Sequence, residues 1–498
     1  MQGEAPQTIG TRTLRGMVWA YGSYVGGRFL VLLSTAVLAR LLVPEEFGVV
    51  ALALTFMALL EVVADLGLSQ ALVIQPEEVL EERSETVFVS SVALGFGLSV
   101  VIAALSPVAA AFFDEPALVG ITAALGANVF LRSLGVTHYA LAQKRLDFRA
   151  RTAAELTGVV VRGLVGIALA LAGMGAWSLV IAYLAGTLAL DVAIWHLVPW
   201  RPSLRPSRDH LPHLLRFGGT LSAVDVLAAI ISNLDYIFIG RVLGATALGL
   251  YTLGFRLPEL IVINLSVVAG RVLFPAFSAV DSYELGRAYL VALRYTVVIA
   301  LPMAVALAVL AEPLIQVAFG DQWLGSVTAM QVLTIYALAV AIGIPAGTVY
   351  KATGRAGVLL KLAALRLALA FTGLLLFVDL GIGAVAACMA TAAGLTALLG
   401  IALASRLLRV GLGGIWSEVR PSLLAAAAMA LPTVAIERVV EAPVLALLLA
   451  GVAGGGAYLG VIYLAAPEWV RYLRSKMFPA PPRPPTGLPE TRETDVIA

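Results

Sequence analysis

Residues 16–38, GMVWAYGSYVGGRFLVLLSTAVL, are long and apolar enough to cross a bilayer, yet they carry Arg28 near their middle. A membrane-spanning helix needs about 20 mostly apolar residues, and an arginine at its centre costs about 2.5 to 3.5 kcal/mol. Arg256 has a similar position in a second apolar stretch. Arginines placed at that cost usually face the interior of a bundle or a watery cavity. The two arginines therefore predict an anion site inside a membrane transporter.

The composition of the whole chain indicates a membrane protein. Hydrophobic residues make up 60% of the 498 residues and charged residues only 13%, with a mean hydropathy of +0.95. A soluble globule of this composition would expose most of its apolar surface to water. We therefore expect an all-α integral membrane protein. The single cysteine, Cys388, excludes an intramolecular disulfide.

Fourteen stretches have the length and apolar character of a transmembrane helix. Their expected ranges are 16–38, 47–68, 86–108, 117–138, 154–173, 177–197, 214–238, 247–270, 288–311, 327–349, 357–379, 381–404, 421–437 and 443–465. The first is not a cleavable signal peptide, because it is long, carries Arg28 and leads directly into the next span.

An internal repeat divides these helices into two lobes. ARLL at 39–42 followed by FG at 47–48 aligns without a gap on GRVL at 240–243 followed by LG at 248–249. The motif occupies the same turn in both copies, so helices 1 to 6 and 7 to 12 are predicted to form a parallel pseudo-twofold repeat. The expected organisation is 1–15 cytoplasmic segment, 16–200 first lobe, 201–410 second lobe, 411–466 helices 13 and 14, and 467–498 cytoplasmic proline-rich tail without fixed structure.

The distribution of basic residues predicts the orientation. With a cytoplasmic amino terminus, 21 lysines and arginines of the loops and helix ends fall inside, against three outside. The three outer ones are Arg40, Arg241 and Arg438. Both termini of this multi-pass protein are therefore expected in the cytoplasm.

Several functional classes are excluded by what the chain lacks. No Walker-type glycine-rich loop is present, and every loop is too short for a nucleotide-binding domain, so ATP is not the expected fuel. Four scattered histidines and one cysteine give no metal-ligand spacing. We expect neither a metal site, nor an enzyme, nor a nucleic-acid partner.

The chain also resembles a known family at several motifs. They are LLVPEEFG at 41–48, DLGLSQAL at 65–72, NLDY at 233–236, GR at 240–241, LGLY at 248–251 and FPAF at 274–277. These stretches resemble polysaccharide and O-antigen flippases of the multidrug/oligosaccharidyl-lipid/polysaccharide exporter superfamily. The resemblance implies a flippase that carries undecaprenyl-pyrophosphate-linked oligosaccharide from the inner to the outer leaflet of the bacterial cytoplasmic membrane. It further implies membrane lipids as surroundings, with the polysaccharide polymerase and chain-length machinery as further partners.

The resemblance also implies central arginines in helices 1 and 8, which is where Arg28 and Arg256 fall. Arginine suits a pyrophosphate because its planar fork forms paired hydrogen bonds with phosphate oxygens and stays charged. Tyr21 and Tyr24 share a face of the first helix with Arg28, so we expect that face to line the cavity. Pro258, beside Arg256, predicts a bend in its helix.

Three further arginines are weaker candidates for the same cavity. Arg366 lies well inside its predicted helix, so both a functional and a structural role are open. Arg132 and Arg162 fall nearer the predicted cytoplasmic ends of their helices. From there they could instead extend to lipid headgroups.

Acidic residues inside the predicted helices raise the question of ion coupling. The candidates are Asp225, Glu61, Asp65 and Glu259. They could bind Na+ or H+, or they could simply neutralise the arginines; Glu259, three residues after Arg256, suits an intrahelical pair. No cofactor is expected. The membrane potential alone would yield about 2.3 kcal/mol per negative charge moved outward across 100 mV.

Two other functions compete with the flippase. A multidrug exporter of the same superfamily would favour acidic rather than cationic pockets for cationic drugs. A membrane glycosyltransferase or polymerase would need a sizeable outer loop for its catalytic groups, whereas loops such as 112–116 and 173–177 are very short. The excess of buried arginines favours the flippase.

Overall fold

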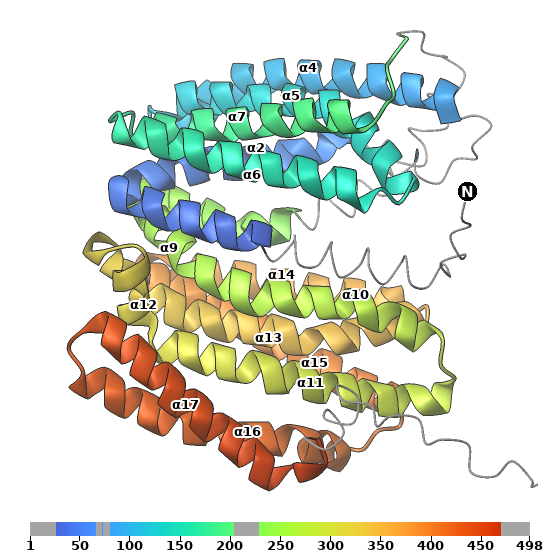
Figure 1. Ribbon diagram of the computed structural model, residues 1–498, viewed down its shortest axis with the longest axis vertical. Coiled ribbons are helices and arrows are strands. Elements are labelled where there is room, and N and C mark those ends of the chain that lie inside the picture. The colour runs from blue at the N-terminus through green and yellow to red at the C-terminus, as the bar shows by residue number, and fades with distance from the viewer. Residues whose placement is uncertain (1–25, 66–71, 73–79, 204–228, 470–498) are drawn as a thin grey trace, which may run out of the picture.

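The computed structural model of the protein, shown in Figure 1, describes residues 26–65, 72, 80–203 and 229–469. All regular structure in these ranges is helical. Within these described ranges, eleven helices are long and apolar enough to cross a membrane, which confirms the predicted all-α multi-pass membrane protein. The predicted spans 16–38, 47–68 and 214–238 include residues outside the described part of the chain. The total of fourteen helices therefore stays a prediction.

The first lobe contains a helix at residues 26–41 and five longer helices (Figure 1). These are α2 (Pro44–Asp65), α4 (Leu80–Phe113), α5 (Leu118–Lys144), α6 (Phe148–Leu171) and α7 (Ala176–Leu197). Helix α5 packs along both α4 and α7, and α6 packs along α7. Glycines allow these close approaches, as at Gly126 of α5, where an added Cβ would lie 2.8 Å from the Ile102 side chain of α4.

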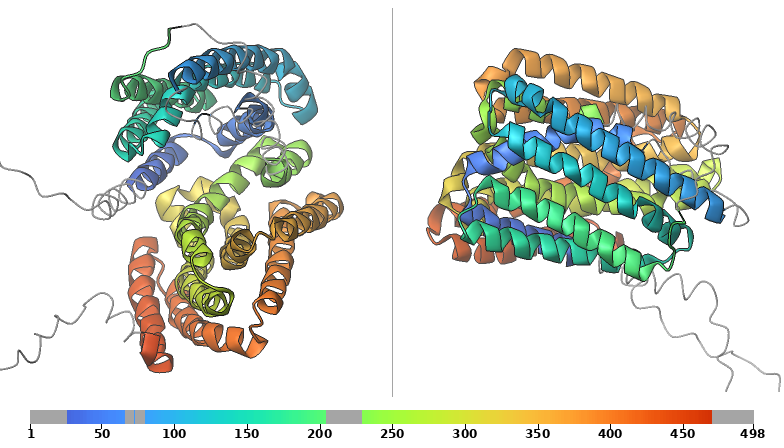
Figure 2. Two further views of the ribbon diagram at one scale, coloured as in Figure 1. Left: turned by 90° about the vertical axis from the view of Figure 1, so that its right-hand side faces the viewer. Right: turned by 90° about the horizontal axis from the view of Figure 1, so that it is seen from above.

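The second lobe is built around α13. Its elements are helix 229–242, α9 (Gly244–Pro258), η2 (Glu259–Ile263), α10 (Asn264–Ser278), α11 (Ser282–Val309), α12 (Ala311–Ala318), η3 (Asp321–Ser326), α13 (Val327–Ala352), α14 (Ala356–Phe377), η4 (Val378–Leu380) and α15 (Ile382–Leu407). Helix α13 packs against α10, α11 and α15. The hairpin of α16 (Leu412–Val439) and α17 (Pro443–Ala465) lies beyond α11, at the far end of the molecule from α4 (Figure 1 and Figure 2, left).

A proline lies beside an irregular turn in one helix and near the predicted start of another. The predicted bend at Pro258 takes the form of a π-helical turn, η2, which directly follows it. A proline removes a backbone donor and crowds the preceding turn, which favours such an irregularity. Helix α16 begins at Leu412 rather than at the predicted residue 421, so that Pro421 lies inside it and its first turns carry the charged Glu418. The Glu418 carboxylate pairs with Arg294 of α11 at 3.3 Å.

The two lobes meet through α2 and α9, which pack together along the predicted repeat. An added Cβ at Gly48 would lie 1.8 Å from the carbonyl oxygen of Ala245, and one at Gly249 would lie 1.9 Å from that of Pro44. The repeat aligns Gly48 with Gly249 and Pro44 with Ala245. Gly48 thus contacts Ala245, and its counterpart Gly249 contacts Pro44, the counterpart of Ala245. This reciprocal contact confirms the pseudo-twofold repeat inferred from the sequence.

A second contact joins the lobes at the end of helix 26–41. The side chains of Gln322 and Trp323, both in η3 of the second lobe, donate hydrogen bonds to the carbonyl oxygen of Ala39, at 2.6 Å and 2.7 Å. The Arg40 guanidinium in turn donates to the carbonyl oxygen of Val317, at 2.5 Å. Trp323 is fully buried. These bonds hold the two lobes together at the end of the molecule that carries Arg40.

Removing this contact should let the lobes separate at that end. The double variant Gln322→Leu with Trp323→Phe removes both donors to one buried carbonyl, at a cost of about 1 to 3 kcal/mol to the closed arrangement. We expect a longer distance between spin labels at Met174→Cys and Leu380→Cys in a Cys388→Ala background, measured by double electron–electron resonance.

Gln331→Leu is the matched control, because its amide donates to the carbonyl of Ala308 within one lobe, at 3.1 Å. That variant should leave the distance unchanged. An unchanged distance in the double variant as well would show that these hydrogen bonds do not hold the lobes together.

Candidate functional site

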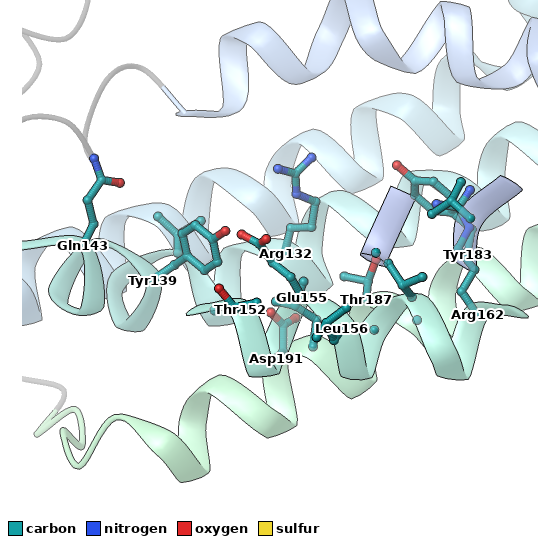
Figure 3. A pocket seen from close by; sticks show the side chains of 18 of the residues that line it. Arg132, Tyr139, Gln143, Thr152, Glu155, Leu156, Arg162, Tyr183, Thr187 and Asp191 are labelled. Carbon is teal, nitrogen blue, oxygen red and sulfur yellow. The ribbon is translucent and has the colours of Figure 1, made fainter. Parts of the chain in front are cut away.

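The first lobe contains a half-open cavity of about 690 Å³ between helix 26–41, α5, α6 and α7. Figure 3 shows Gln143 at one end, Arg162 and Tyr183 at the other, and Arg132 and Glu155 between them. This volume lies in the range of small-molecule sites. All the lining residues come from the first lobe.

Small residues hold the cavity helices close together. An added Cβ at Gly186 of α7 would lie 2.8 Å from the Cβ of Arg162 on α6 and 2.9 Å from the carbonyl oxygen of Gly158. Helix 26–41 approaches α6 at Gly163, where an added Cβ would collide with Ser34. The side chain of Arg162 packs along α7, where its guanidinium lies over the ring of Tyr183.

Three of the predicted arginines line this one cavity: Arg28, Arg132 and Arg162. The sequence placed Arg132 and Arg162 near the cytoplasmic ends of their helices. In the structure α5 extends to Lys144 and α6 begins at Phe148, so both arginines lie near the middle of their helices. The additional turns, residues 139–144 of α5 and 148–153 of α6, contain charged and polar residues, so the sequence analysis assigned them to the loop. The location of these arginines in the cavity suits ligand binding better than contact with lipid headgroups.

Two acidic residues that the sequence analysis did not select also line the cavity. Glu155 interacts electrostatically with Arg28, and Asp191 with Arg132. Asp191 is only 5% exposed, and its Oδ2 atom has no hydrogen-bond partner among the described residues. The sequence alone could have identified Asp191 as a candidate, because it is an ionisable residue within an apolar helix. The same rule that selected the arginines applies to it.

Arg256 belongs to α9 of the second lobe and lies near the Arg162 end of the cavity. It pairs with Glu259 at 3.4 Å, as their spacing predicted, and it is close enough to Arg162 for the two guanidinium groups to repel. The Arg162 guanidinium lies over the ring of Tyr183, 4.1 Å from its centroid. Two arginines from different lobes thus lie close enough to repel one another, and the single carboxylate beside them among the described residues, that of Glu259, leaves an excess of positive charge at this point.

Arg366 does not line this cavity. Its guanidinium donates to the hydroxyl of Tyr336 at 2.6 Å and interacts electrostatically with Asp235. The buried Asp235 accepts a hydrogen bond of 2.7 Å from Tyr251. Arg366 therefore belongs to a polar network inside the second lobe, where it offsets the charge of Asp235.

A smaller cavity of about 310 Å³ lies between the lobes. It is lined by α2 and Tyr183 on one side and by Asn233, Tyr236 and Thr252 on the other. Tyr183 lines both cavities. The two cavities therefore lie next to one another at Tyr183, whose ring carries the Arg162 guanidinium.

Some predicted site residues lie outside what the structure describes. These are Tyr21, Tyr24 and Asp225, together with the side chains of Glu61 and Asp65. Their predicted contribution to the cavity or to ion coupling stays a prediction. Among the described residues, no group of histidine, cysteine, aspartate and glutamate could hold a metal ion.

The fold and the cavity together define the class: a multi-pass membrane protein of two repeated helical lobes, joined at one end, with a cavity lined by arginines. The chain belongs to the family of polysaccharide biosynthesis proteins, whose family model matches residues 37–328, more than half of its length.

Comparison with known proteins agrees with this membership. The chain is 29% identical to the succinoglycan biosynthesis transport protein ExoT of Rhizobium meliloti, over 74% of each chain. It is 26% identical to the lipopolysaccharide biosynthesis protein WzxC of Escherichia coli, over 70% of this chain and 72% of that one. Its fold is similar to that of the lipid II flippase MurJ in an inward closed conformation, with a TM-score of 0.76, 15% identity, and coverage of 91% of this chain and 100% of that one.

Proposed function

We propose that the protein is a flippase for a lipid-linked oligosaccharide. Its substrate is an oligosaccharide joined to undecaprenyl by a pyrophosphate, which it moves from the inner to the outer leaflet of the bacterial cytoplasmic membrane. The product serves the assembly of a surface polysaccharide such as O-antigen, capsule or exopolysaccharide. The observation that carries the proposal is the cavity lined by Arg28, Arg132 and Arg162, with Arg256 facing Arg162 from the second lobe.

The chemistry of these arginines fits a pyrophosphate. Arg162 and Arg256 repel one another, so an anion between them relieves that repulsion while it gains charge-assisted hydrogen bonds. Arg28 lines the same cavity from the first helix. A cationic drug would meet the opposite field here, which argues against a multidrug exporter.

The short links between helices argue against an enzyme. Only four residues join α4 to α5, and four join α6 to α7. A glycosyltransferase or polymerase would need room for catalytic groups outside the bilayer. The family relatives are likewise named for transport or polysaccharide biosynthesis.

The distribution of basic residues places the end of the molecule that carries Arg40 outside and the end that carries Lys144 inside. In that orientation both termini are cytoplasmic. The lobe contacts at Gly48 and Trp323 then close the outer side, while the cavity extends along α5 toward the inner side at Gln143. This arrangement suits loading of substrate from the inner leaflet, followed by rocking of the lobes about their contact.

The membrane potential is a sufficient driving force. Moving a doubly charged pyrophosphate outward across a negative-inside potential yields about 4 to 5 kcal/mol per 100 mV. Coupling to Na+ or H+ is the alternative source of energy. The surrounding lipids, the polysaccharide polymerase and the chain-length machinery complete the set of proposed partners.

Binding measurements test the proposed anion site. Native mass spectrometry with undecaprenyl-pyrophosphate-linked oligosaccharide should show that Arg28→Ala and Arg256→Ala each bind about 10- to 100-fold more weakly than the wild type. Arg256→Ala loses a charge-assisted bond, and Arg28→Ala leaves the negative charge of Glu155 without its partner in the cavity. Arg438→Ala, an exposed arginine of α16, is the control and should bind normally. Full retention of binding by both cavity variants would remove the arginines from the anion site.

A further inference from the structure

The cavity is longer than a pyrophosphate requires. On α5 its lining runs from Arg132 to Gln143, and on α6 from Arg162 back to Thr152. At the rise of an α-helix these stretches are about 16 Å and about 15 Å long. A pyrophosphate held between Arg162 and Arg256 occupies only one end. The remainder must hold something else, and the next group along the substrate is the first sugar.

The charges along the cavity divide it into two sections. At the end near the lobe contact, Arg162 and Arg256 lie close enough to repel, and the single carboxylate beside Arg256 in the described part of the chain, that of Glu259, leaves positive charge in excess. Farther along, each arginine has an acidic neighbour: Arg28 interacts with Glu155, and Arg132 with Asp191. The second section is therefore close to electrically neutral, although it is polar.

The polar groups of the neutral section suit sugar hydroxyls. Thr152, Gln143 and Tyr139 line it and offer a hydroxyl, an amide and a phenol. The Tyr139 oxygen already accepts a bond of 3.3 Å from Arg151, so its own proton remains available to donate. Asp191 supplies a buried carboxylate oxygen, Oδ2, that has no hydrogen-bond partner among the described residues. A hydroxyl group both donates and accepts, and therefore matches this mixture.

We propose that the section lined by Tyr139, Gln143, Thr152, Glu155 and Asp191 is a carbohydrate subsite that takes an uncharged pyranose, the sugar next to the pyrophosphate. This inference rests on the proposed flippase function. Each charged group of this section already has an opposite charge that interacts with it, Arg28 with Glu155 and Arg132 with Asp191. A carboxylate or an ammonium group on the sugar would add a charge without a partner of its own. Either charge would be disfavoured relative to a neutral hydroxyl group.

Three lipid probes separate the sugar subsite from the anion site. These are undecaprenyl pyrophosphate, its galactose conjugate and its galacturonate conjugate, which differs from galactose only at carbon 6. By native mass spectrometry the wild type should bind the galactose conjugate more tightly than undecaprenyl pyrophosphate. It should bind the galacturonate conjugate about 10-fold more weakly than the galactose conjugate.

Substitutions of nearly equal shape then locate the subsite. Gln143→Met with Thr152→Val should weaken binding of the galactose conjugate about 10-fold, because two hydrogen bonds are lost. Binding of undecaprenyl pyrophosphate should not change. Thr157→Val is the control on α6, since Thr157 is exposed, does not line the cavity and bonds only its own helix at Ala153.

The variant Glu155→Gln is a second test of the subsite, separate from the double variant. Removing this negative charge should reduce or abolish the preference for galactose over galacturonate. Undiminished binding of the galactose conjugate by the double variant, or an unchanged sugar preference in Glu155→Gln, would overturn the subsite while leaving the anion site intact. Failure of undecaprenyl pyrophosphate to bind, or binding that Arg162→Ala does not weaken, would overturn the proposed function and the subsite with it.

Discussion

Arg162→Ala should abolish flipping of a lipid-linked oligosaccharide, while the folded protein stays at least as thermally stable as the wild type. Arg162 lines the cavity near the middle of α6 and faces Arg256 across the lobe contact. In the absence of substrate the two guanidinium groups repel, so removing one relieves an unfavourable interaction. In its presence the pyrophosphate loses one of its two facing partners. Function and stability should therefore change in different directions.

The measurement is flipping by the purified protein in proteoliposomes, paired with thermal unfolding in detergent. We expect flipping by Arg162→Ala to fall at least about 10-fold, the equivalent of one charge-assisted hydrogen bond. Arg162→Lys should recover part of the activity, because it keeps the charge but lacks the bidentate fork. A parallel loss of stability and flipping in Arg162→Ala would instead assign the arginine to the packing of α6 against Tyr183.

Gly48→Val should prevent the lobes from closing at the end that carries Arg40. Even the first carbon of the new side chain would lie 1.8 Å from the carbonyl oxygen and 2.4 Å from the carbonyl carbon of Ala245. These are backbone atoms, so α2 and α9 can accommodate it only by moving apart. Overpacking of this kind typically costs about 1 to 3 kcal/mol. We expect loss of polysaccharide export in cells and a lower unfolding temperature.

Two further variants test whether the effect of Gly48→Val comes from its collision with the backbone of α9. Gly97→Ala, at an exposed position of α4 where an added Cβ meets nothing within 4 Å, should leave export unchanged. Ala245→Gly should not rescue Gly48→Val, since the collision is with the backbone and not with the Ala245 side chain. Rescue by Ala245→Gly, or normal export by Gly48→Val, would show that the two helices are not held in this close contact during transport.

The resemblance to polysaccharide flippases and the excess of arginines in apolar helices were enough to predict the class of protein. The repeat could also be predicted from the sequence. Both lobes use the same turn, so the motif that contains Gly48 recurs around Gly249. The candidate site was less accessible. Arg28, Arg132 and Arg162 converge on one cavity, whereas Arg366, which the sequence places deeper in its helix than Arg132 and Arg162, bonds to Tyr336 elsewhere.

The sequence by itself determined the all-α membrane class, the repeat and the presence of costly internal charges. It could do so because the bilayer imposes length and apolar character on each helix separately. Only the tertiary structure decided which charges meet. Lipid and packed protein are both apolar, so a transmembrane helix shows little in its sequence of which face turns inward. The approach of α6 to α7 at Gly158 and Gly186 sets that rotation. It brings Arg162 to Arg256 and places Glu155 and Asp191 in the same cavity.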